Sequence, residues 1–299
     1  LLYVQRFFDP IRALTMHYST LQRAMASGHR IFELLDIEID IKDAKDAKDI
    51  NVKKGAIEFQ NVNFEYNFNE PVLKNLNFTI KENETIGLVG PTGSGKTSIA
   101  SLIHRFYEIK SGIINIDGQD IQKITQSSLS DNISMVLQDP IIFSGTVEDN
   151  IKYKAKASRE EVIEASKVVG SHSFIMTLPK GYDTVLEESG ANISVGQRQL
   201  LSFARALLLD SKIFILDEAT SYIDSYTERQ IQNALDKVLD NRTGIIIAHR
   251  LSTIKNADKI IVLNKGEIVE IGNHEDLLSN KNLYWKLWSN NESSFDDLN

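Results

Sequence analysis

The sequence has 299 residues, with 33 Lys and Arg residues against 41 Asp and Glu residues and a formal net charge of −8. This length suits one large domain or two moderate ones. The composition, 42% hydrophobic and 25% charged, is that of an ordinary globular protein. The acidic balance argues against a general nucleic-acid binder, and the absence of cysteine excludes disulfides, thiolate nucleophiles and Cys-ligated zinc. The six histidines show no paired spacing such as H-E-x-x-H, which excludes that type of metalloprotease site.

Residues 1–35 carry the pattern of one long amphipathic helix. Apolar side chains repeat every seven residues in two registers, one of Val4, Ile11, Tyr18 and Met25 and the other of Phe7, Leu14 and Leu21. Such a repeat predicts either a seam that packs on another helix or the core-facing side of an ordinary helix. Pro10 would kink this helix or lie near its first turns. The start at Leu1, without Met or a signal-peptide pattern, suggests a sequence cut from a longer one. No apolar run of about 18 residues is present that could span a bilayer.

A charged segment separates this helix from the rest of the chain. The near-repeat Lys-Asp-Ala-Lys-Asp-Ala-Lys-Asp over residues 42–49 has almost no apolar side chains to bury. It is typical of a solvated linker or surface segment. We therefore expect an N-terminal helical segment over residues 1–40, a linker over 41–54 and a separate domain over 55–299.

The pattern of the third segment indicates an α/β domain. After a β-rich stretch at residues 57–66, short apolar runs at 86–89, 133–137, 213–216 and 245–248 alternate with helical patterns such as that of residues 99–106. Continuous apolar strands between amphipathic helices predict a mainly parallel sheet that is covered on both faces. Residues 259–263 and 267–271 flank Asn264, Lys265 and Gly266, which predicts a hairpin. A last helix, over residues 283–288, is expected to pack on the domain.

The sharpest local signal is a glycine-rich stretch that matches the phosphate-loop pattern G-x-x-x-x-G-K-[ST]. It lies between an apolar run and a helical pattern, the strand–loop–helix context that such a loop requires. Glycines let backbone N–H groups turn inward, Lys96 supplies a charge for the β- and γ-phosphates, and the Thr97 hydroxyl suits Mg²⁺. The predicted nucleotide-binding residues are Gly90, Pro91, Thr92, Gly93, Ser94, Gly95, Lys96, Thr97 and Ser98. A dinucleotide-binding G-x-G-x-x-G is not formed, because Ser98 stands at its third glycine position.

Polar side chains follow three other apolar runs. Asp217 and Glu218 follow residues 213–216, Gln138 ends the run that begins at residue 133, and His249 ends the run that begins at residue 245. Because ligands of open α/β sheets bind beyond the carboxyl ends of the strands, these side chains should converge on the phosphate loop. Asp217 and Gln138 are candidate Mg²⁺ ligands, and Glu218 could orient or deprotonate a water molecule. His249 would lie near the γ-phosphate.

Together these residues resemble the nucleotide-binding domain of an ABC transporter. The similarity runs from about residue 55 to the end, with every landmark in the family order. Tyr66 matches the aromatic residue that stacks on adenine, Gln138 the Q-loop and His249 the switch histidine. The signature motif, usually L-S-G-G-Q, is matched by Ser194, Gly196 and Gln197 within residues 192–199, and the D-loop by residues 221–224 with Asp224.

The resemblance implies a P-loop NTPase core with an antiparallel β subdomain and a helical subdomain over about residues 140–212. Residues 1–40 are similar to the end of the last transmembrane helix, with its cytoplasmic extension, in multidrug- or lipid-exporter half-transporters. Two such domains sandwich two ATP molecules, each held by one phosphate loop and by the signature motif of the partner domain. The implied partners are a second half-transporter and the plasma (inner) membrane, at its cytoplasmic face, and no nucleic acid.

The implied activity is hydrolysis of MgATP coupled to export. Lys96 would offset phosphate charge, Glu218 would polarise the attacking water, and His249 would steady the γ-phosphate. Gln138 would contact Mg²⁺ and water. Two other hypotheses remain open at this point: a soluble ABC-type ATPase acting on nucleic acid, and a regulatory module that binds ATP without hydrolysing it.

Val195 departs from the family pattern, because it stands at the first glycine of the signature motif. A β-branched residue adds bulk there and has no access to positive φ, so a weaker contact to the ATP of the partner is expected. An intact Glu218 beside an altered signature favours a heterodimer with unequal sites. A homodimer in which valine is simply tolerated is the alternative.

Overall fold

The computed structural model describes residues 2–38, 41–137, 139–217, 225–247 and 251–296. The predicted site residues Gln138, Glu218, Asp224 and His249 lie outside the described residues. The chain divides into two compact units, Leu1–Lys42 and Asp43–Asn299.

The first unit is a single helix, α1 (Leu2–Leu35), which confirms the N-terminal helix predicted from the seven-residue repeat. Pro10 lies within the helix rather than ending it. The side chains of the apolar repeat are exposed, with Phe7 at 68% and Leu14 at 71% of their full accessibility. Over the described residues, no helix reaches the length and hydrophobicity needed to cross a bilayer.

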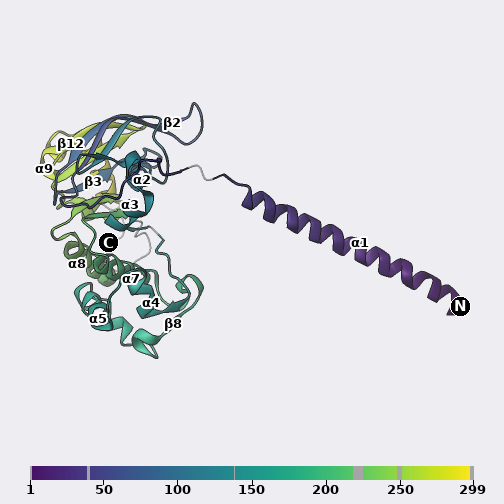
Figure 1. Cartoon of the computed structure of the whole chain (residues 1–299). Coiled ribbons are helices and arrows are strands. Elements are labelled where there is room, and N and C mark those ends of the chain that lie inside the picture. Colours follow the sequence, from purple (N-terminus) through teal and green to yellow (C-terminus); the bar gives the residue numbers. More distant parts are fainter. Residues whose placement is uncertain (1, 39–40, 138, 218–224, 248–250, 297–299) are drawn as a thin grey trace. The chain divides into compact units, whose positions relative to one another are not determined.

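The second unit is mixed α/β, as predicted (Figure 1). Its strands are β1 (Ile57–Glu65), β2 (Pro71–Ile80), β3 (Thr85–Val89), β4 (Ser111–Ile116), β5 (Gln119–Asp120), β6 (Ile133–Val136), β7 (Gly145–Thr146), β8 (Val185–Leu186), β9 (Ile213–Asp217), β10 (Thr243–Ile247), β11 (Lys259–Asn264) and β12 (Glu267–Gly272). Its α-helices are α2 (Lys96–Ile103), α3 (Gln126–Asn132), α4 (Val147–Lys152), α5 (Arg159–Val168), α6 (His172–Ile175), α7 (Val195–Leu208), α8 (Ser225–Leu239), α9 (His274–Ser279) and α10 (Leu283–Asp296). Short 3₁₀ helices span Ile121–Lys123, Gly181–Asp183, Glu188–Gly190 and Leu251–Ile254.

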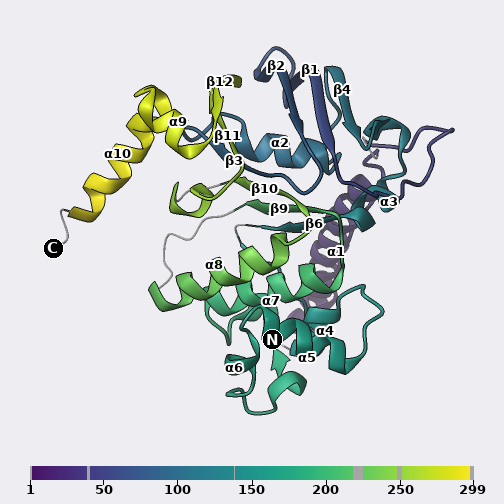
Figure 2. The same ribbon diagram turned by 90° about the vertical axis from the view of Figure 1, so that its left-hand side faces the viewer.

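The strands form two main sheets. The larger has the order β12-β11-β3-β10-β9-β6 and is parallel except for β12, which pairs with β11 in the predicted antiparallel hairpin. The smaller has the order β2-β1-β4-β5 and is antiparallel. Figure 2 shows α2 between the two sheets, with α7 and α8 on the far side of the larger one.

Alternate residues of the central strands enter two separate cores. In β9, Ile213 and Ile215 pack with α2 and the smaller sheet, whereas Phe214 and Leu216 pack with α7 and α8. All four side chains are fully buried. A strand buried on both faces has no polar positions to alternate with, which is why its sequence is continuously apolar.

A helical lobe lies within residues 140–212. In it, α4 and α5 pack on α7, and the two-residue strands β7 and β8 pair with each other. Capping boxes that use a carboxylate begin two of its helices, at Thr146 for α4 and at Ser158 for α5. In each box, the hydroxyl of the N-cap residue and the carboxylate three residues later satisfy backbone N–H groups at the helix start.

The segment predicted as a linker is attached to the second unit. Residues 42–49 are mostly exposed, as their composition predicts, but Lys48 forms a bridge with Ile124. Ile50 and Val52 are buried in the core beside the smaller sheet, and the Ile50 N–H donates to the Ser128 hydroxyl at 2.8 Å. These two buried side chains anchor an otherwise highly charged segment together with hydrogen bonds, such as those from the Gln126 N–H to Asp43 and from the Thr125 N–H to the Lys48 carbonyl.

Candidate functional site

The glycine-rich loop connects an inner strand of the larger sheet to a helix. β3 ends at Val89 and α2 begins at Lys96, so the loop occupies residues 90–95, as the sequence pattern requires. Gly95 is the N-cap residue of α2 in the left-handed region, and no side chain of the described residues caps the helix. An uncapped helix start behind a glycine loop presents backbone N–H groups to an anion.

The three glycines of this loop have different environments. Gly90 and Gly95 have positive φ of 155° and 102°, and a Cβ atom on either would collide, at Gly90 with the Leu263 carbonyl and at Gly95 with the Leu73 side chain. Gly93 also has a positive φ, 78°, but has open space where its Cβ atom would be. The loop is thus packed at both ends and open in its middle, which leaves room for a ligand over Gly93.

Lys96 is 8% exposed and its ammonium group lies against the loop itself. The Nζ atom donates to the Gly90 carbonyl at 2.8 Å and to the Pro91 carbonyl at 3.1 Å. Burial lowers the pKa of Lys96, and the negative charge of Asp217 opposes that shift. A poorly hydrated ammonium group held beside an open loop is suited to bind phosphate oxygens.

Three other residues at or beside the loop fit a magnesium–phosphate ligand. Ser94 is 3% exposed, and its buried hydroxyl has no hydrogen-bond partner among the described residues. Asp217 is 6% exposed at the end of β9, and Thr97 is the second residue of α2. Hydroxyl and carboxylate oxygens are the ligands that Mg²⁺ prefers, so Thr97 and Asp217 could hold this ion.

The strands that carry the other predicted residues end at this edge of the sheet. β6, β9 and β10 are adjacent and parallel, and Asp217 is paired with Ile247, the last residue of β10. The structure therefore describes the strand ends directly before Gln138, Glu218 and His249, but not these residues themselves. Their roles stay predictions.

Tyr66 follows the last residue of β1 and is 48% exposed. Its hydroxyl is hydrogen-bonded to the Ser98 hydroxyl at 2.9 Å, which joins it to the first turn of α2. Its ring lies nearly perpendicular to the rings of Phe64 and Tyr107. The sequence predicts Tyr66 and Ser98 separately as binding residues, and the bond between them is visible only in the structure.

The signature-like residues lie at the start of α7, which packs on the face of the sheet opposite α2. Ser194 is the N-cap residue of this helix. Its hydroxyl accepts from the Gln197 N–H at 3.2 Å, and the Gln197 side chain accepts from the Ser194 N–H at 3.0 Å. Ser194 is exposed and Gly196 is buried, so the capped helix start presents the serine at the surface.

The backbone conformation of Val195 shows that this position of the signature motif does not need positive φ. Val195 is the first residue of α7 and is not among the residues with positive φ. Loss of access to positive φ therefore has no consequence at this position. The added bulk remains, because the side chain is 39% exposed beside Ser194.

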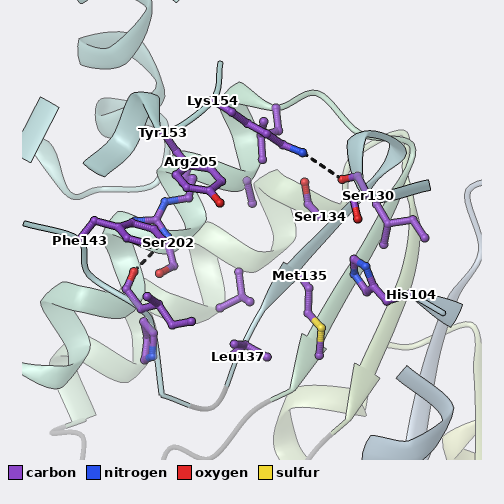
Figure 3. Close-up of a pocket in the computed structure, with 16 residues that line it drawn as sticks. His104, Ser130, Ser134, Met135, Leu137, Phe143, Tyr153, Lys154, Ser202 and Arg205 are labelled. Atoms are coloured by element: carbon purple, nitrogen blue, oxygen red, sulfur yellow. Dashed lines mark hydrogen bonds between the residues drawn. The ribbon is translucent and has the colours of Figure 1, made fainter. Parts of the chain in front are cut away.

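A second pocket, of about 210 Å³, opens between β6 and α7 (Figure 3). On one side, the guanidinium group of Arg205 lies over the rings of Phe143 and Tyr153, at 5.4 and 5.3 Å from their centres. Arg205 also donates to the carbonyls of Ile141 and Asn150, at 3.0 and 2.8 Å. Through these contacts Arg205, on α7 of the helical lobe, binds the segment that follows residue 138. Neither Arg205 nor Asn150 stands at a strand end, so the pattern of polar residues after apolar runs does not predict them.

His104 lines the other side of this pocket and is 5% exposed. Its ring stacks on Phe106, and neither ring nitrogen has a hydrogen-bond partner among the described residues. Burial, aided by the positive charge of Lys154, lowers the pKa of His104 from 6.5 to about 4. The imidazole is therefore neutral at pH 7.

This shift predicts a pH-dependent stability. Between pH 6.5 and 4 the unfolded chain binds a proton at His104 that the folded chain does not, so stability falls as the pH falls through this interval. His104→Leu should reduce that fall by up to about 3 kcal/mol. Urea unfolding of both proteins at pH 7 and pH 4.5 measures the difference. His29→Leu, at an exposed position of α1, is the control, and an equal pH dependence in wild type and His104→Leu would contradict the prediction.

Comparisons of this chain with a family model, with known proteins and with solved structures indicate the same protein family. A protein-family model described as "ABC transporter" matches residues 73–221, which include the glycine loop, Asp217 and the start of α7. The chain is 46% identical over 295 residues to the "Uncharacterized ABC transporter ATP-binding protein YfiC" of Bacillus subtilis, covering 98% of this chain and 48% of that protein. It is 45% identical over 283 residues to an "ATP-dependent lipid A-core flippase" of Desulfotalea psychrophila, covering 94% and 49%.

A solved structure with a similar fold indicates the same family. A bacterial Atm1-family ABC exporter with ATP bound matches with a TM-score of 0.83 at 39% identity, over 97% of this chain and 51% of that one. The chain thus spans about half the length of the relatives it matches.

Proposed function

The chain belongs to the ABC transporter family as an ATP-binding domain, and from this premise we propose that it hydrolyses MgATP to drive export across a membrane. The observation that carries the ATP site is the glycine loop, which is open over Gly93. The Lys96 ammonium group lies at it, as does the Ser94 hydroxyl, which has no hydrogen-bond partner in the part of the chain that the structure describes. Export is supported by relatives described as lipid A-core flippases and multidrug resistance transporters, which are about twice as long as this chain.

In the proposed reaction, water attacks the γ-phosphorus in line with the bond to the leaving ADP. Lys96 and the loop N–H groups neutralise phosphate charge, and Glu218 accepts a proton from the attacking water. His249 steadies the γ-phosphate. Thr97, Asp217 and Gln138 would hold Mg²⁺, which would offset negative charge on the phosphates. Tyr66 would stack on the base.

ATP would close two domains face to face, with Ser194, Gly196, Gln197 and Asp224 of one domain completing the nucleotide site of the other. The γ-phosphate then acts as a removable clamp, because its loss on hydrolysis reopens the dimer. Residues 1–40 would continue from a membrane portion and pass on this movement, with the domain at the cytoplasmic face of the plasma (inner) membrane. The net charge of −8 gives no support to an action on nucleic acid.

Phosphate release by the purified full chain with MgATP tests the hydrolytic part of this proposal. For export, the full-length protein would be reconstituted in liposomes, and ATP-dependent movement of fluorescent lipids and of a hydrophobic dye would be followed. Hydrolysis without transport of either probe leaves the ATPase in place and removes these two substrate classes. Absence of magnesium-dependent hydrolysis would overturn the proposal.

We further propose a heterodimer with a second half-transporter in preference to a homodimer. In this arrangement the chain supplies the phosphate-loop side of the competent site, and Val195 faces the weaker site of the partner. Val195 is exposed beside the Ser194 hydroxyl, so its bulk would weaken the contact to the ATP of the partner domain.

The heterodimer predicts slow ATP hydrolysis by the chain alone. Val195→Gly should raise that turnover about tenfold, since one recovered contact to phosphate is worth about 1.5 kcal/mol. Steady-state phosphate release, measured against ATP and protein concentration, checks this. Ala191→Gly, at an exposed position just before the signature, is the matched control. Brisk, cooperative turnover by the unaltered chain alone would defeat the heterodimer.

A further inference from the structure

Residues 43–52, which we call the strap, are held on α3 by hydrogen bonds and by buried side chains. The Ser128 hydroxyl accepts from the Ile50 N–H at 2.8 Å and donates to the Ile50 carbonyl at 3.0 Å. The side chain of Asn132, the last residue of α3, accepts from the Val52 N–H at 3.3 Å and donates to the Ile50 carbonyl at 3.2 Å. Ile50 and Val52 are also buried, so polar and apolar contacts hold this end of the strap together.

The strap also contacts the first residues of α3. The side chain of the N-cap residue, Thr125, forms no capping bond to the helix among the described residues. Instead, the Asp43 carboxylate accepts from the Gln126 N–H at 2.9 Å, and the Asp49 carboxylate accepts from the Thr125 hydroxyl at 2.5 Å. Carboxylates stabilise a helix start because its N–H groups have no partner within the helix and carry partial positive charge. The strap thus stabilises α3 as well as being held by it.

The strap begins only a few residues after α1. This helix ends at Leu35, so residues 36–42 alone separate it from Asp43. Because an extended chain spans at most about 3.5 Å per residue, the docked strap limits the tether between Leu35 and Asp43 to about 28 Å. A chain that was free from Leu35 to the start of β1 at Ile57 could span about 77 Å. A short tether transmits a displacement that a long flexible one would absorb.

The elements that hold the strap lead to the candidate nucleotide site. α3 ends at Asn132, and β6 begins at the next residue and pairs with β9, whose last residue is Asp217. Arg105 lies two residues beyond the end of α2, the helix that follows the glycine loop. It is buried, and its guanidinium group forms an ion pair with Asp43 at 3.6 Å. The strap is therefore attached to two of the elements that form the site.

We propose that the strap is the attachment through which the ATP-binding domain moves α1, with Ser128 and Asn132 as its main contacts on α3. This rests on the proposed function, in which the N-terminal segment passes movement to a membrane portion. While the strap is docked, the tether to α1 stays short and a movement of α3 reaches that helix. When the strap is released, the tether becomes slack, so hydrolysis continues but less transport follows from each ATP.

Hydrogen exchange in the full chain tests whether the strap is docked. The Ile50 amide should be protected, and Ser128→Ala should speed its exchange about 10- to 100-fold, because two hydrogen bonds worth about three- to tenfold each are lost. Ser127→Ala, at an exposed position of the same helix, is the matched control. An unprotected Ile50 amide in the unaltered chain, or equal exchange in the two serine variants, would overturn the docking.

Transport per ATP tests the attachment in the full-length protein, reconstituted in liposomes with the lipid and dye probes. Ile50→Ser combined with Val52→Ser should release the strap, because two buried aliphatic side chains are lost. Transport per ATP should then fall at least about threefold, while phosphate release is kept. Asp49→Cys and Thr125→Cys, added to this variant, replace a hydrogen-bonded pair. The disulfide between them should restore transport per ATP on oxidation, and reduction should abolish the restoration.

Asp43→Ala combined with Asp49→Ala changes only exposed side chains, so it tests the attachment even where the serine variant fails to fold. It should also lower transport per ATP. Asp46→Ala is its control, since this exposed aspartate has no hydrogen bond within the described part of the chain. Unchanged transport per ATP in the released variants, or no restoration by the disulfide, would overturn the role of the strap. If the unaltered protein hydrolysed MgATP but moved neither probe, the proposed export would fail instead, and hydrogen exchange would still decide whether the strap is docked.

Discussion

Lys96→Ala should weaken the binding of MgATP about 10- to 100-fold and reduce hydrolysis to background. The ammonium group places a full positive charge at the glycine loop, at 2.8 Å from the Gly90 carbonyl. A charged hydrogen-bond donor to phosphate contributes about 1.5–3 kcal/mol, which corresponds to this loss. Titration calorimetry with MgATP measures the affinity.

Lys167→Ala is the control for this experiment. Lys167 lies on α5 in the helical lobe, is exposed, and pairs only locally with Glu164. Its loss should leave both binding and turnover unchanged, and equal unfolding temperatures would show that Lys96→Ala still folds. If Lys96→Ala bound MgATP as tightly as the unaltered chain, the glycine loop would not be the phosphate site.

Glu218→Gln should keep the binding of MgATP and lower kcat about 10²- to 10⁴-fold, the usual contribution of a general base. The amide has the shape of the carboxylate but cannot accept a proton from the attacking water. In the sequence Glu218 directly follows Asp217, the last residue of β9, whose negative charge acts on the Lys96 ammonium group. Single-turnover hydrolysis separates the chemical step from nucleotide binding.

Glu267→Gln, at an exposed position of β12, is the matched control. If Glu218→Gln binds MgATP without hydrolysing it, the variant should stay in the nucleotide-bound state. Unchanged kcat in Glu218→Gln would remove this residue from the reaction. Absence of single-turnover hydrolysis by the unaltered chain would instead favour the regulatory, non-hydrolysing module.

The parts of the fold predicted from sequence are those in which a single pattern extends over many residues. Strands β3, β9 and β10 contain continuous apolar runs because both of their faces are buried, and the seven-residue repeat of α1 extends over three periods, from Val4 to Met25. The two-residue strands β7 and β8 are too short for any period, and they depend on pairing with each other across about forty residues. The burial of Ile50 and Val52 is likewise a tertiary effect, because their neighbours in sequence are polar or charged.

The candidate site divides in the same way. The loop from Gly90 to Thr97 could be found because glycine, lysine and threonine are needed at fixed spacing. The bond between Tyr66 and Ser98 joins residues 32 positions apart, and no local pattern announces it. The φ angle of Val195 could not be read from a motif, because the same letters fit a loop or the first residue of a helix.

The two-sided burial of β9 limits how this gene segment can change in length. Inserting or deleting one residue at the start of β9 would move each following side chain to the other face of the sheet. Phe214 would then point toward α2, and Ile215 toward α7. The same slip would carry Asp217 away from its place across from Ile247 at the rim of the sheet. The same five residues of β9 therefore determine both the packing of the strand and the position of Asp217. Insertions and deletions in β9 should be selected against even at positions where substitutions are tolerated.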